Sequence, residues 1–385
     1  MNDKLLIIGS GHLARRLKVQ AQLAGYKIEE FLPPNLKGDD GGTFDGIVED
    51  LSALNPGRFL MTYLVDDKDE ANIRTFIALS SINSKLPITI SLFNERVSPH
   101  IRAAHPNVRI LNPARIAAPV FIAGLDRPVE RALRYKPTPL DREKEKGTDR
   151  LITILVSSFL LLIGIAVCYF HLYDGLPWLD ALYFVIVTVA TVGYGDINLL
   201  NASPESKVAG IGLIILSTFF IWLIFSLTID RVIKKRVELS LGRKRYRHRN
   251  HIILCGLGRL GYFIAEGILE RGEKLIIIES NESSPAIRHF RNLGADVYIG
   301  DARSPRVLED ANVSAAKALL SVIDDDYVNM EVGLNARSFS PALKLILRIF
   351  DQSMSEQVRT HLDIHLTYSA TSIAVPEFLA VLKNR

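Results

Sequence analysis

The chain has 385 residues, of which 48% are hydrophobic, with a mean hydropathy of +0.17 and a formal net charge of +4. This hydropathy is high for a soluble protein and too low for one that lies mostly in a membrane, so it fits a membrane module between soluble domains. The two cysteines, Cys168 and Cys255, exclude a disulfide framework. We expect no signal peptide, because the opening "MNDKLLIIGSG" leads directly into a strand and a glycine turn.

The first predicted elements are a strand, a glycine turn and a helix in "KLLIIGSGHLARRL" at 4–17. This order is typical of Rossmann-like α/β domains, which hold phosphates where the turn meets the helix. The motif is degenerate, because Ala14 replaces the third glycine and only Glu29 and Glu30 approximate the acid that would bind a ribose. We therefore predict that residues 1–135 form a Rossmann-like regulatory domain with a structural role.

A polar linker at 136–150 leads into the first of two uncharged apolar runs, Leu151–Phe170 and Val208–Ile229. At about 1.5 Å per residue, a helix of either length crosses roughly 30 Å of hydrocarbon. Two such runs in one chain favour membrane spans over buried core helices. We predict a transmembrane domain at 151–230, with a shorter helix at 177–190 between the spans.

The stretch "TVATVGYGD" at 188–196 follows this short helix, where irregular backbone is tolerated only if protein buries it or it lines water. Alternating glycines allow successive carbonyl groups to face the same side, because glycine accepts positive φ. Four copies around an axis would then form rings of oxygen atoms that replace the hydration shell of a potassium ion. The predicted filter residues are Thr191, Val192, Gly193, Tyr194, Gly195 and Asp196, and the potassium ion would lie at Thr191, Val192, Gly193 and Tyr194.

The sequence "TVGYGD" at 191–196 resembles the signature filter of potassium channels, in the order outer helix, pore helix, filter and inner helix. The resemblance covers roughly Leu151–Ile229 and implies a two-transmembrane-helix prokaryotic potassium channel. Such a channel is a homotetramer in contact with membrane lipid, with K⁺ as the permeant ion. Tyr183 and Phe184 replace two tryptophans that many members carry beside the filter, which implies a less firmly braced filter.

Charges flanking the spans predict their orientation. Lys and Arg gather before the first span and in the basic linker at 231–249, whereas the loop between the spans carries Asp174, Asp180, Asp196 and Glu205. By the positive-inside rule, we expect a multi-pass protein of the cell inner membrane with both termini in the cytoplasm. The basic linker is expected to lie at the anionic leaflet and not to bind nucleic acid.

The C-terminal segment at 250–385 repeats the pattern of the first domain. A strand and glycine turn in "HIILCGLGRLGYFI" at 251–264 are followed by a second strand that ends at Glu279. Three further similarities occur in the same order, such as "ARIAAPVFIAGL" at 114–125 against "TSIAVPEFLAVL" at 371–382. We predict a second Rossmann-like domain related to the first, here with the glycines and acid that nucleotide binding requires.

This second segment resembles the regulator-of-potassium-conductance domain, which is TrkA-N-like. The matching pieces are "HIILCGLGRLG", Glu279, "IGDA" at 299–302 and "IDDD" at 323–326. The resemblance implies that NAD(H) or an adenine nucleotide (ATP, ADP or AMP) binds here as a regulatory ligand, with its phosphates on the glycine turn. The implied nucleotide-binding residues are Gly256, Gly258, Arg259, Leu260, Gly261, Glu279 and Asp301.

The sequence therefore predicts a mixed fold, an all-α two-span module flanked by two α/β Rossmann-like domains. Its expected function is a ligand-gated, potassium-selective channel and not an enzyme, and four chains would supply an eight-domain cytoplasmic gating ring. Two alternatives remain, a membrane-anchored NAD-dependent oxidoreductase and a subunit of a potassium uptake transporter. The first finds no convincing catalytic His, Lys and Tyr arrangement, and the second resembles chains with repeated span–loop–span units, of which this sequence has one.

Overall fold

The computed structural model describes residues 3–32, 43–128, 147–361 and 364–383. It divides into two compact units, and each is described by itself: one joins Met1–Leu140 with Leu241–Arg385, and the other is Asp141–Ser240. The first unit holds two parallel α/β domains and the second is helical, which confirms the predicted fold class. Most of the predicted linker at 136–150 lies outside the described residues.

The N-terminal domain alternates strands with helices. Its elements are β1 (Lys4–Ile8), α1 (His12–Leu23), β2 (Lys27–Phe31), α2 (Phe44–Ala53), η2 (Pro56–Arg58), β3 (Met61–Leu64), α3 (Asp69–Ile82), β4 (Ile88–Ser91), α4 (Ser98–Ala104), β5 (Val108–Leu111), α5 (Pro113–Ala123) and η3 (Gly124–Asp126). The strands form a parallel sheet in the order β2-β1-β3-β4-β5. Almost every residue of β1, β3 and β4 is buried, as expected for strands covered by helices on both faces.

The C-terminal domain has the same alternation with one more strand. Its elements are β6 (Ile252–Cys255), α9 (Arg259–Glu270), β7 (Leu275–Glu279), α10 (Ala286–Asn292), β8 (Asp296–Ile299), α11 (Pro305–Asp310), η4 (Val313–Ala315), β9 (Ala318–Ser321), α12 (Asp326–Phe339), β10 (Lys344–Arg348), α13 (Gln352–His361), β11 (Leu366–Tyr368) and α14 (Ala370–Lys383). The parallel sheet has the order β11-β10-β9-β6-β7-β8. This is the strand order of dinucleotide-binding folds, in which ligands bind where the order reverses, here between β6 and β9.

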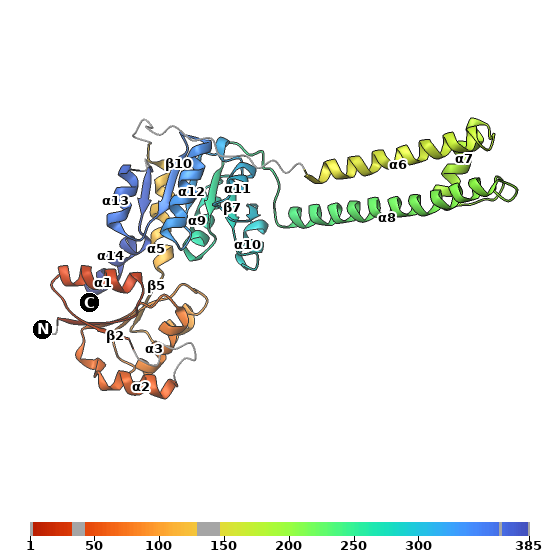
Figure 1. The fold of residues 1–385 in the computed structure, drawn as a ribbon. Coiled ribbons are helices and arrows are strands. Elements are labelled where there is room, and N and C mark those ends of the chain that lie inside the picture. Colours follow the sequence, from red (N-terminus) through yellow and green to blue (C-terminus); the bar gives the residue numbers. More distant parts are fainter. Residues whose placement is uncertain (1–2, 33–42, 129–146, 362–363, 384–385) are drawn as a thin grey trace. The chain divides into compact units, whose positions relative to one another are not determined.

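The last helix of each domain packs on the other domain (Figure 1). In α5, Ala117 and Phe121 share a core cluster with Ile264 and Ile268 of α9. In the reverse direction, α14 packs against α1, and Phe378 is fully buried beside residues of β1 and β3. The exchange makes the two domains one body, because removing either helix would open the core of its neighbour.

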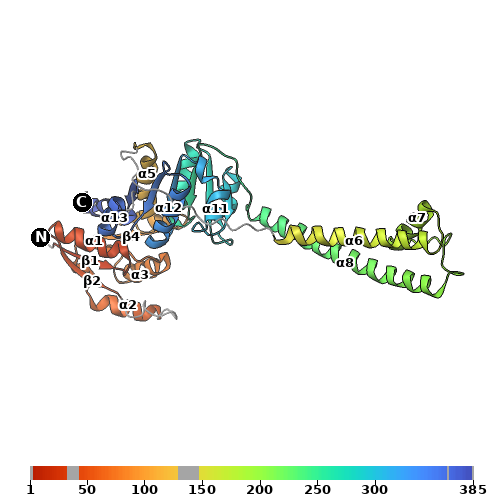
Figure 2. The ribbon, with the colours of Figure 1, turned by 45° about the horizontal axis from the view of Figure 1, so that its top comes forward.

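The helical unit contains two long helices and one short one. They are α6 (Gly147–Leu172), α7 (Trp178–Val189) and α8 (Pro204–Ser240). Two views show α6 and α8 side by side, with α7 at the end where the chain turns (Figures 1 and 2). Their shared core gathers at that end around Phe170, Phe184 and Leu213. α6 begins before the expected start of the span at 151, and α8 continues through the first residues of the predicted basic linker at 231–249.

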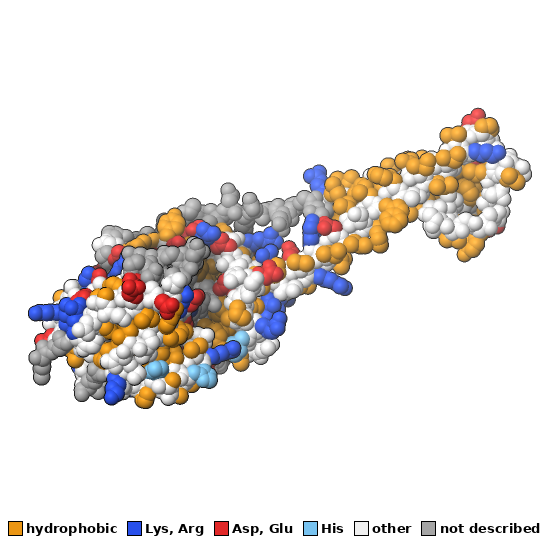
Figure 3. Space-filling model, turned by 90° about the horizontal axis from the view of Figure 1, so that it is seen from below, with side chains coloured by type: hydrophobic (Ala, Val, Ile, Leu, Met, Phe, Trp, Pro, Cys, Tyr) orange, Lys and Arg blue, Asp and Glu red, His pale blue; other side chains and the backbone are white. Residues whose placement is uncertain are grey.

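Both long helices meet the criteria of length and apolarity for crossing a membrane. Only 11% of the most apolar window of Arg150–Leu172 and 17% of that of Pro204–Ser240 are buried. Apolar side chains therefore cover much of the helical surface (Figure 3). Because core helices of soluble proteins are mostly buried, this exposed surface requires lipid or further copies of the chain to cover it.

Candidate functional site

The turn after α7 has an alternating backbone. Thr191, Gly193 and Gly195 have φ values of 56°, 58° and 81°. For a β-branched residue such as Thr191, this left-handed conformation is a genuine outlier. Backbone strain of this kind persists only where the surrounding structure enforces it, and it concentrates at functional sites.

Hydrogen bonds fix the direction of the first carbonyl groups in this turn. The N–H groups of Val192 and Gly193 both donate to the carbonyl oxygen of Val187, at 3.0 and 3.3 Å, and so point back at the end of α7. In a trans peptide the carbonyl group opposes the N–H of the next residue. The carbonyls of Thr191 and Val192 therefore point away from the end of α7.

The nucleotide-type turn follows β6 in the C-terminal domain. A Cβ on Gly261 would lie 2.0 Å from the carbonyl oxygen of Gly256, so α9 packs against the turn too closely for any side chain. Gly258 is the residue that caps the amino end of α9, and a Cβ there would meet nothing within 4 Å. An open backbone turn at the start of a twelve-residue helix offers N–H groups and a helix dipole to an anion.

Two acids lie at the strand ends beside this turn. Glu279 ends β7 and is 91% buried, and its carboxylate accepts hydrogen bonds from the N–H groups of Leu257 at 2.6 Å and Asn281 at 2.7 Å. Asp301 follows β8 and pairs with Arg303, whose hydrogen bond lowers the pKa of the Asp301 carboxyl. Both carboxylates face the same cavity.

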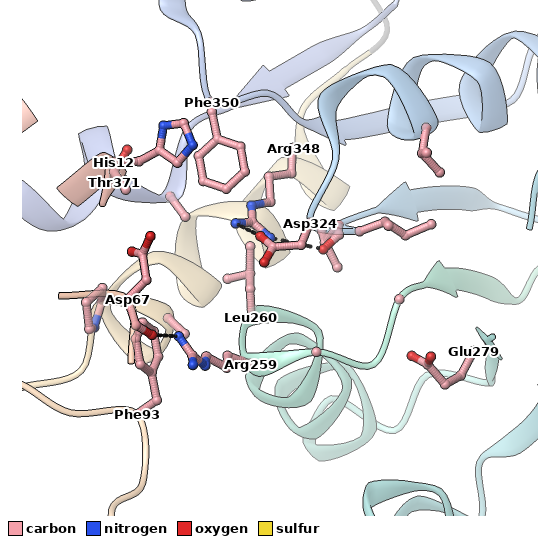
Figure 4. Close-up of a pocket in the computed structure, with 18 of the residues that line it drawn as sticks. His12, Asp67, Phe93, Arg259, Leu260, Glu279, Asp324, Arg348, Phe350 and Thr371 are labelled. Atoms are coloured by element: carbon pink, nitrogen blue, oxygen red, sulfur yellow. Dashed lines mark hydrogen bonds and ion pairs between the residues drawn. The ribbon is translucent and has the colours of Figure 1, made fainter. Parts of the chain in front are cut away.

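Arg259 and Leu260 differ from the other predicted nucleotide-binding residues. Arg259 donates to the backbone carbonyl of Asp67, and its guanidinium lies 4.1 Å from the centre of the Phe93 ring (Figure 4). It therefore reaches the N-terminal domain instead of the glycine turn. Leu260 is 4% exposed and packs in the core of the C-terminal domain, so only its backbone is available to a ligand.

The cavity beside these residues measures about 850 Å³ and is shared by both domains. The wall that continues away from the glycine turn carries His12, Phe93, Asp324, Arg348 and Phe350 (Figure 4). The imidazole of His12 stacks on Phe350 at 4.3 Å and the guanidinium of Arg348 lies 4.0 Å from the same ring. Sequence reasoning named none of these five as a binding residue, although Asp324 lies in the quoted "IDDD" and their positions in the internal repeat were a usable signal.

The N-terminal copy differs from this site in two described features. Ile8 at the end of β1 pairs with Phe31, and the equivalent Cys255 at the end of β6 pairs with Ile278. The residue after Ile278 is Glu279, so its counterpart in the N-terminal domain is Leu32. Glu29 is instead ion-paired with Lys4 and Arg58, which hold the pKa of its carboxyl below the usual value. Glu29 and Glu30 are thus not equivalents of Glu279.

The sheets show the second difference. The N-terminal sheet has no described strand corresponding to β8, the strand that places Asp301 at the cavity. The described part of this domain therefore lacks both acids of the C-terminal site.

The segment that follows α8 is bound to the edge of the C-terminal sheet. The N–H of Ile299, the last residue of β8, donates to the carbonyl of Leu241 at 2.8 Å, and Nε of Arg243 donates to the carbonyl of Ile299 at 2.8 Å. Gly242 lies so close to β8 that a Cβ would be 2.0 Å from the carbonyl oxygen of Val297. This attachment, which we call the β8 clamp (Leu241, Gly242 and Arg243), lies two residues from Asp301.

Two family models match the chain. The model described as "Ion channel" matches residues 155–234, and the model described as "TrkA-N domain" matches residues 252–369. The first range contains α7 and the predicted filter, and the second contains the glycine turn, Glu279 and Asp301. The TrkA-N range lies within the segment at 250–385 that carries the second resemblance, and the ion-channel range overlaps the segment at 151–229 and extends five residues beyond it.

Curated relatives include prokaryotic potassium channels. Potassium channel protein 1 of Methanocaldococcus jannaschii is 31% identical over 183 residues, which are 46% of this chain and 54% of the relative. The voltage-gated potassium channel Kch of Escherichia coli (strain K12) is 29% identical over 194 residues, 49% of this chain and 46% of the relative. The chain thus spans about half the length of these curated relatives.

A solved structure described as the GsuK RCK domain matches 99% of this chain and 76% of its own, with a TM-score of 0.57 and 14% identity, which shows a shared fold. Family models and relatives together agree with the resemblance. The chain combines a segment that matches the ion-channel family with one that matches the TrkA-N family, and it is similar to prokaryotic potassium channels.

Proposed function

We propose that this protein is the subunit of a homotetrameric, potassium-selective channel whose opening is regulated by a nucleotide bound to its C-terminal domain. The observation that carries the proposal is the alternating backbone at Thr191, Gly193 and Gly195. Such alternation places successive carbonyl groups on one side, and those of Thr191 and Val192 point away from α7. Four copies would arrange these oxygen atoms in rings around a potassium ion.

The surroundings of this turn support a pore for cations. The dipole of α7 places partial negative charge at its C-terminal end, from which the turn starts. Asp196 adds a carboxylate at the other end of the predicted filter. The ion-channel family model covers this segment, and relatives whose printed names are potassium channels match the chain.

The cavity of the C-terminal domain supports nucleotide regulation. Gly258 leaves the amino end of α9 open for phosphates, and Glu279 and Asp301 would accept hydrogen bonds from the ribose and base of NAD(H) or an adenine nucleotide. The β8 clamp links Asp301 to α8 through the covalent chain. A ligand that binds more tightly to one position of β8 would thereby favour one state of the inner helix.

Localisation and assembly follow from the same proposal. The exposed apolar surfaces of α6 and α8 would face lipid of the cell inner membrane, with both termini in the cytoplasm by the charge of the flanking segments. Four chains would bring eight Rossmann-like domains. Each chain already joins its own two domains through α5 and α14, so a ring needs contacts only between such pairs.

The test is potassium flux from proteoliposomes that contain the purified protein, measured without ligand and then with NAD, NADH, ATP and ADP in turn. The Gly258→Ala variant is the control for the site, because its Cβ would enter the space that phosphate requires. Flux that one nucleotide changes in the wild type and not in the variant supports both parts of the proposal. Flux that is indifferent to all four supports the channel and contradicts regulation by these nucleotides.

A further inference from the structure

Asp67 and Asp324 occupy equivalent positions in the two domains. Asn72 donates to the carbonyl of Ser91 at 3.0 Å, and Asn329 donates in the same way to the carbonyl of Arg348 at 3.0 Å. The same amides also bind the backbone that follows β3 and β9, through Asp66 and Ile323. Because the two asparagines bind their carbonyl groups in the same way, Ser91 and Arg348 are equivalent. Asp67 and Asp324 each follow directly after the backbone residue that the asparagine holds, so they are equivalent too.

The two equivalent carboxylates lie in different places. In the N-terminal domain a Cβ on Gly11 would lie 2.2 Å from Oδ1 and 2.4 Å from Oδ2 of Asp67, so this carboxylate covers the turn at the amino end of α1. Burial is the main cause that raises the pKa of Asp67. The aspartate thus fills the place that a phosphate would take in a nucleotide-binding domain.

In the C-terminal domain the corresponding turn is open. A Cβ on Gly258 would meet nothing within 4 Å, and Oδ1 of Asp324 instead accepts a hydrogen bond from Nη2 of Arg348 at 2.6 Å. The side chain of Arg348 is 13% exposed and that of Asp324 is 86% exposed. The arginine is therefore packed inside the protein, and it binds the exposed aspartate from the side of the protein interior (Figure 4). Its guanidinium also lies on the ring of Phe350.

We propose that Arg348 is a positioning residue that holds the Asp324 carboxylate away from the phosphate turn. In the N-terminal domain the equivalent residue is Ser91, which has no guanidinium to hold Asp67, and Asp67 therefore closes the turn. The consequence for nucleotides rests on the proposed function of the C-terminal site. The inference explains why one of two related turns is accessible to an anion. It also makes Asp324 an intrinsic competitor for phosphate once Arg348 is lost.

The first test is a cryo-electron-microscopy structure of the full-length Arg348→Ser variant without ligand, beside the wild type. The variant reproduces the N-terminal pair of side chains in the C-terminal domain. We expect the Asp324 carboxylate to lie against Gly258 as that of Asp67 lies against Gly11. An Asp324 that stays away from Gly258 would overturn the inference, whether or not the protein binds nucleotides.

The second test measures ADP binding to the full-length protein in lipid nanodiscs by calorimetry. We expect Arg348→Ser to weaken binding by about tenfold or more, since a carboxylate in the turn repels phosphate. Asp324→Ala should bind at least as tightly as the wild type, and Arg348→Ser/Asp324→Ala should regain most of the lost affinity. Arg348→Lys, which keeps the charge, should retain partial binding.

The outcomes separate the two proposals. A double variant as weak as Arg348→Ser would overturn the positioning role, because Arg348 would then act by direct contact or through the fold. Unchanged ADP affinity in a variant whose Asp324 covers Gly258 would also overturn it. A wild type that fails to bind ADP counts against this ligand in the proposed function, and the ligand-free structures still decide the position of Asp324.

Discussion

The phenol of Tyr183 donates a hydrogen bond to Oδ2 of Asp196 across 2.9 Å and so ties α7 to the far end of the predicted filter. The sequence led us to expect a weaker brace, because the family resemblance implies tryptophans where this chain has Tyr183 and Phe184. In the structure Phe184 packs in the core with Phe170, at 4.9 Å between ring centres, and Tyr183 supplies the polar contact. One residue fills space and the other holds the carboxylate.

Replacing Tyr183 by phenylalanine should shorten channel openings while leaving potassium selectivity intact. The ring remains but Asp196 loses its donor, so the end of the filter is held less firmly. Single-channel recording in planar bilayers measures the open times. Tyr173→Phe is the matched control, because that ring stacks on Tyr169 outside the filter. Equal open times in Tyr183→Phe and the control would show that the hydrogen bond has no role in conduction.

Gly193→Ala should abolish potassium flux and leave nucleotide binding unchanged. Gly193 has a φ of 58°, where a side chain costs roughly 1–2 kcal/mol. Gly164→Ala on α6 is the control, since a Cβ there also meets nothing within 4 Å but the residue lies within a helix. Flux assays on both variants, with ADP calorimetry alongside, check the prediction. Normal selective flux through Gly193→Ala would contradict the assignment of the filter.

The two glycines at α9 should respond differently to alanine. Gly258→Ala should leave the unfolding temperature unchanged and weaken nucleotide binding by about tenfold or more, because the Cβ has space until a phosphate arrives. Gly261→Ala should instead destabilise the domain, since its Cβ would lie 2.0 Å from the carbonyl of Gly256. Thermal unfolding and ADP calorimetry distinguish the pair. Loss of stability without loss of affinity in Gly258→Ala would argue against a phosphate at this turn.

The β8 clamp predicts a variant that binds nucleotide without responding to it. Gly242→Ala would place a Cβ 2.0 Å from the carbonyl oxygen of Val297 and so displace the clamp, whereas no clamp residue lines the cavity itself. Gly272→Ala is a close control, because both glycines have a φ of 70° but a Cβ on Gly272 meets nothing within 4 Å.

Calorimetry and flux must be measured on the same preparations for this comparison. Unchanged ADP affinity together with loss of the nucleotide's effect on flux, in Gly242→Ala alone, is the expected result. If both variants keep the full response, the signal does not pass through the clamp.

Much of the fold could be read from local sequence patterns. The apolar runs, the glycine turns and the repeated order of motifs are set by neighbouring residues, and the family matches and the sheets agree with them. The exchange of α5 and α14 could not be predicted, because an apolar helix does not specify which domain will cover it. The sequence left Glu29 and Glu30 as approximate candidates for the ribose acid of the N-terminal copy for a related reason, since only the strand register shows that Leu32 occupies its place.

Side-chain contacts across long separations were also beyond the sequence. The pairing of Arg259 with the carbonyl of Asp67 joins residues 192 positions apart. Asp67 and Asp324 look alike in the sequence, and their different positions depend on Ser91 and Arg348 in neighbouring strands. Motifs therefore located the candidate nucleotide turn, but the residues proposed to keep it open required the structure.

The most direct test of the central claim is the reversal potential of the purified protein in a planar bilayer, with potassium on one side and sodium on the other. A filter of carbonyl rings predicts a potential set by potassium alone, and its loss in Gly193→Ala. A potential near zero, with potassium and sodium passing equally through demonstrably tetrameric protein, would contradict the assignment of Thr191–Asp196 as a potassium filter.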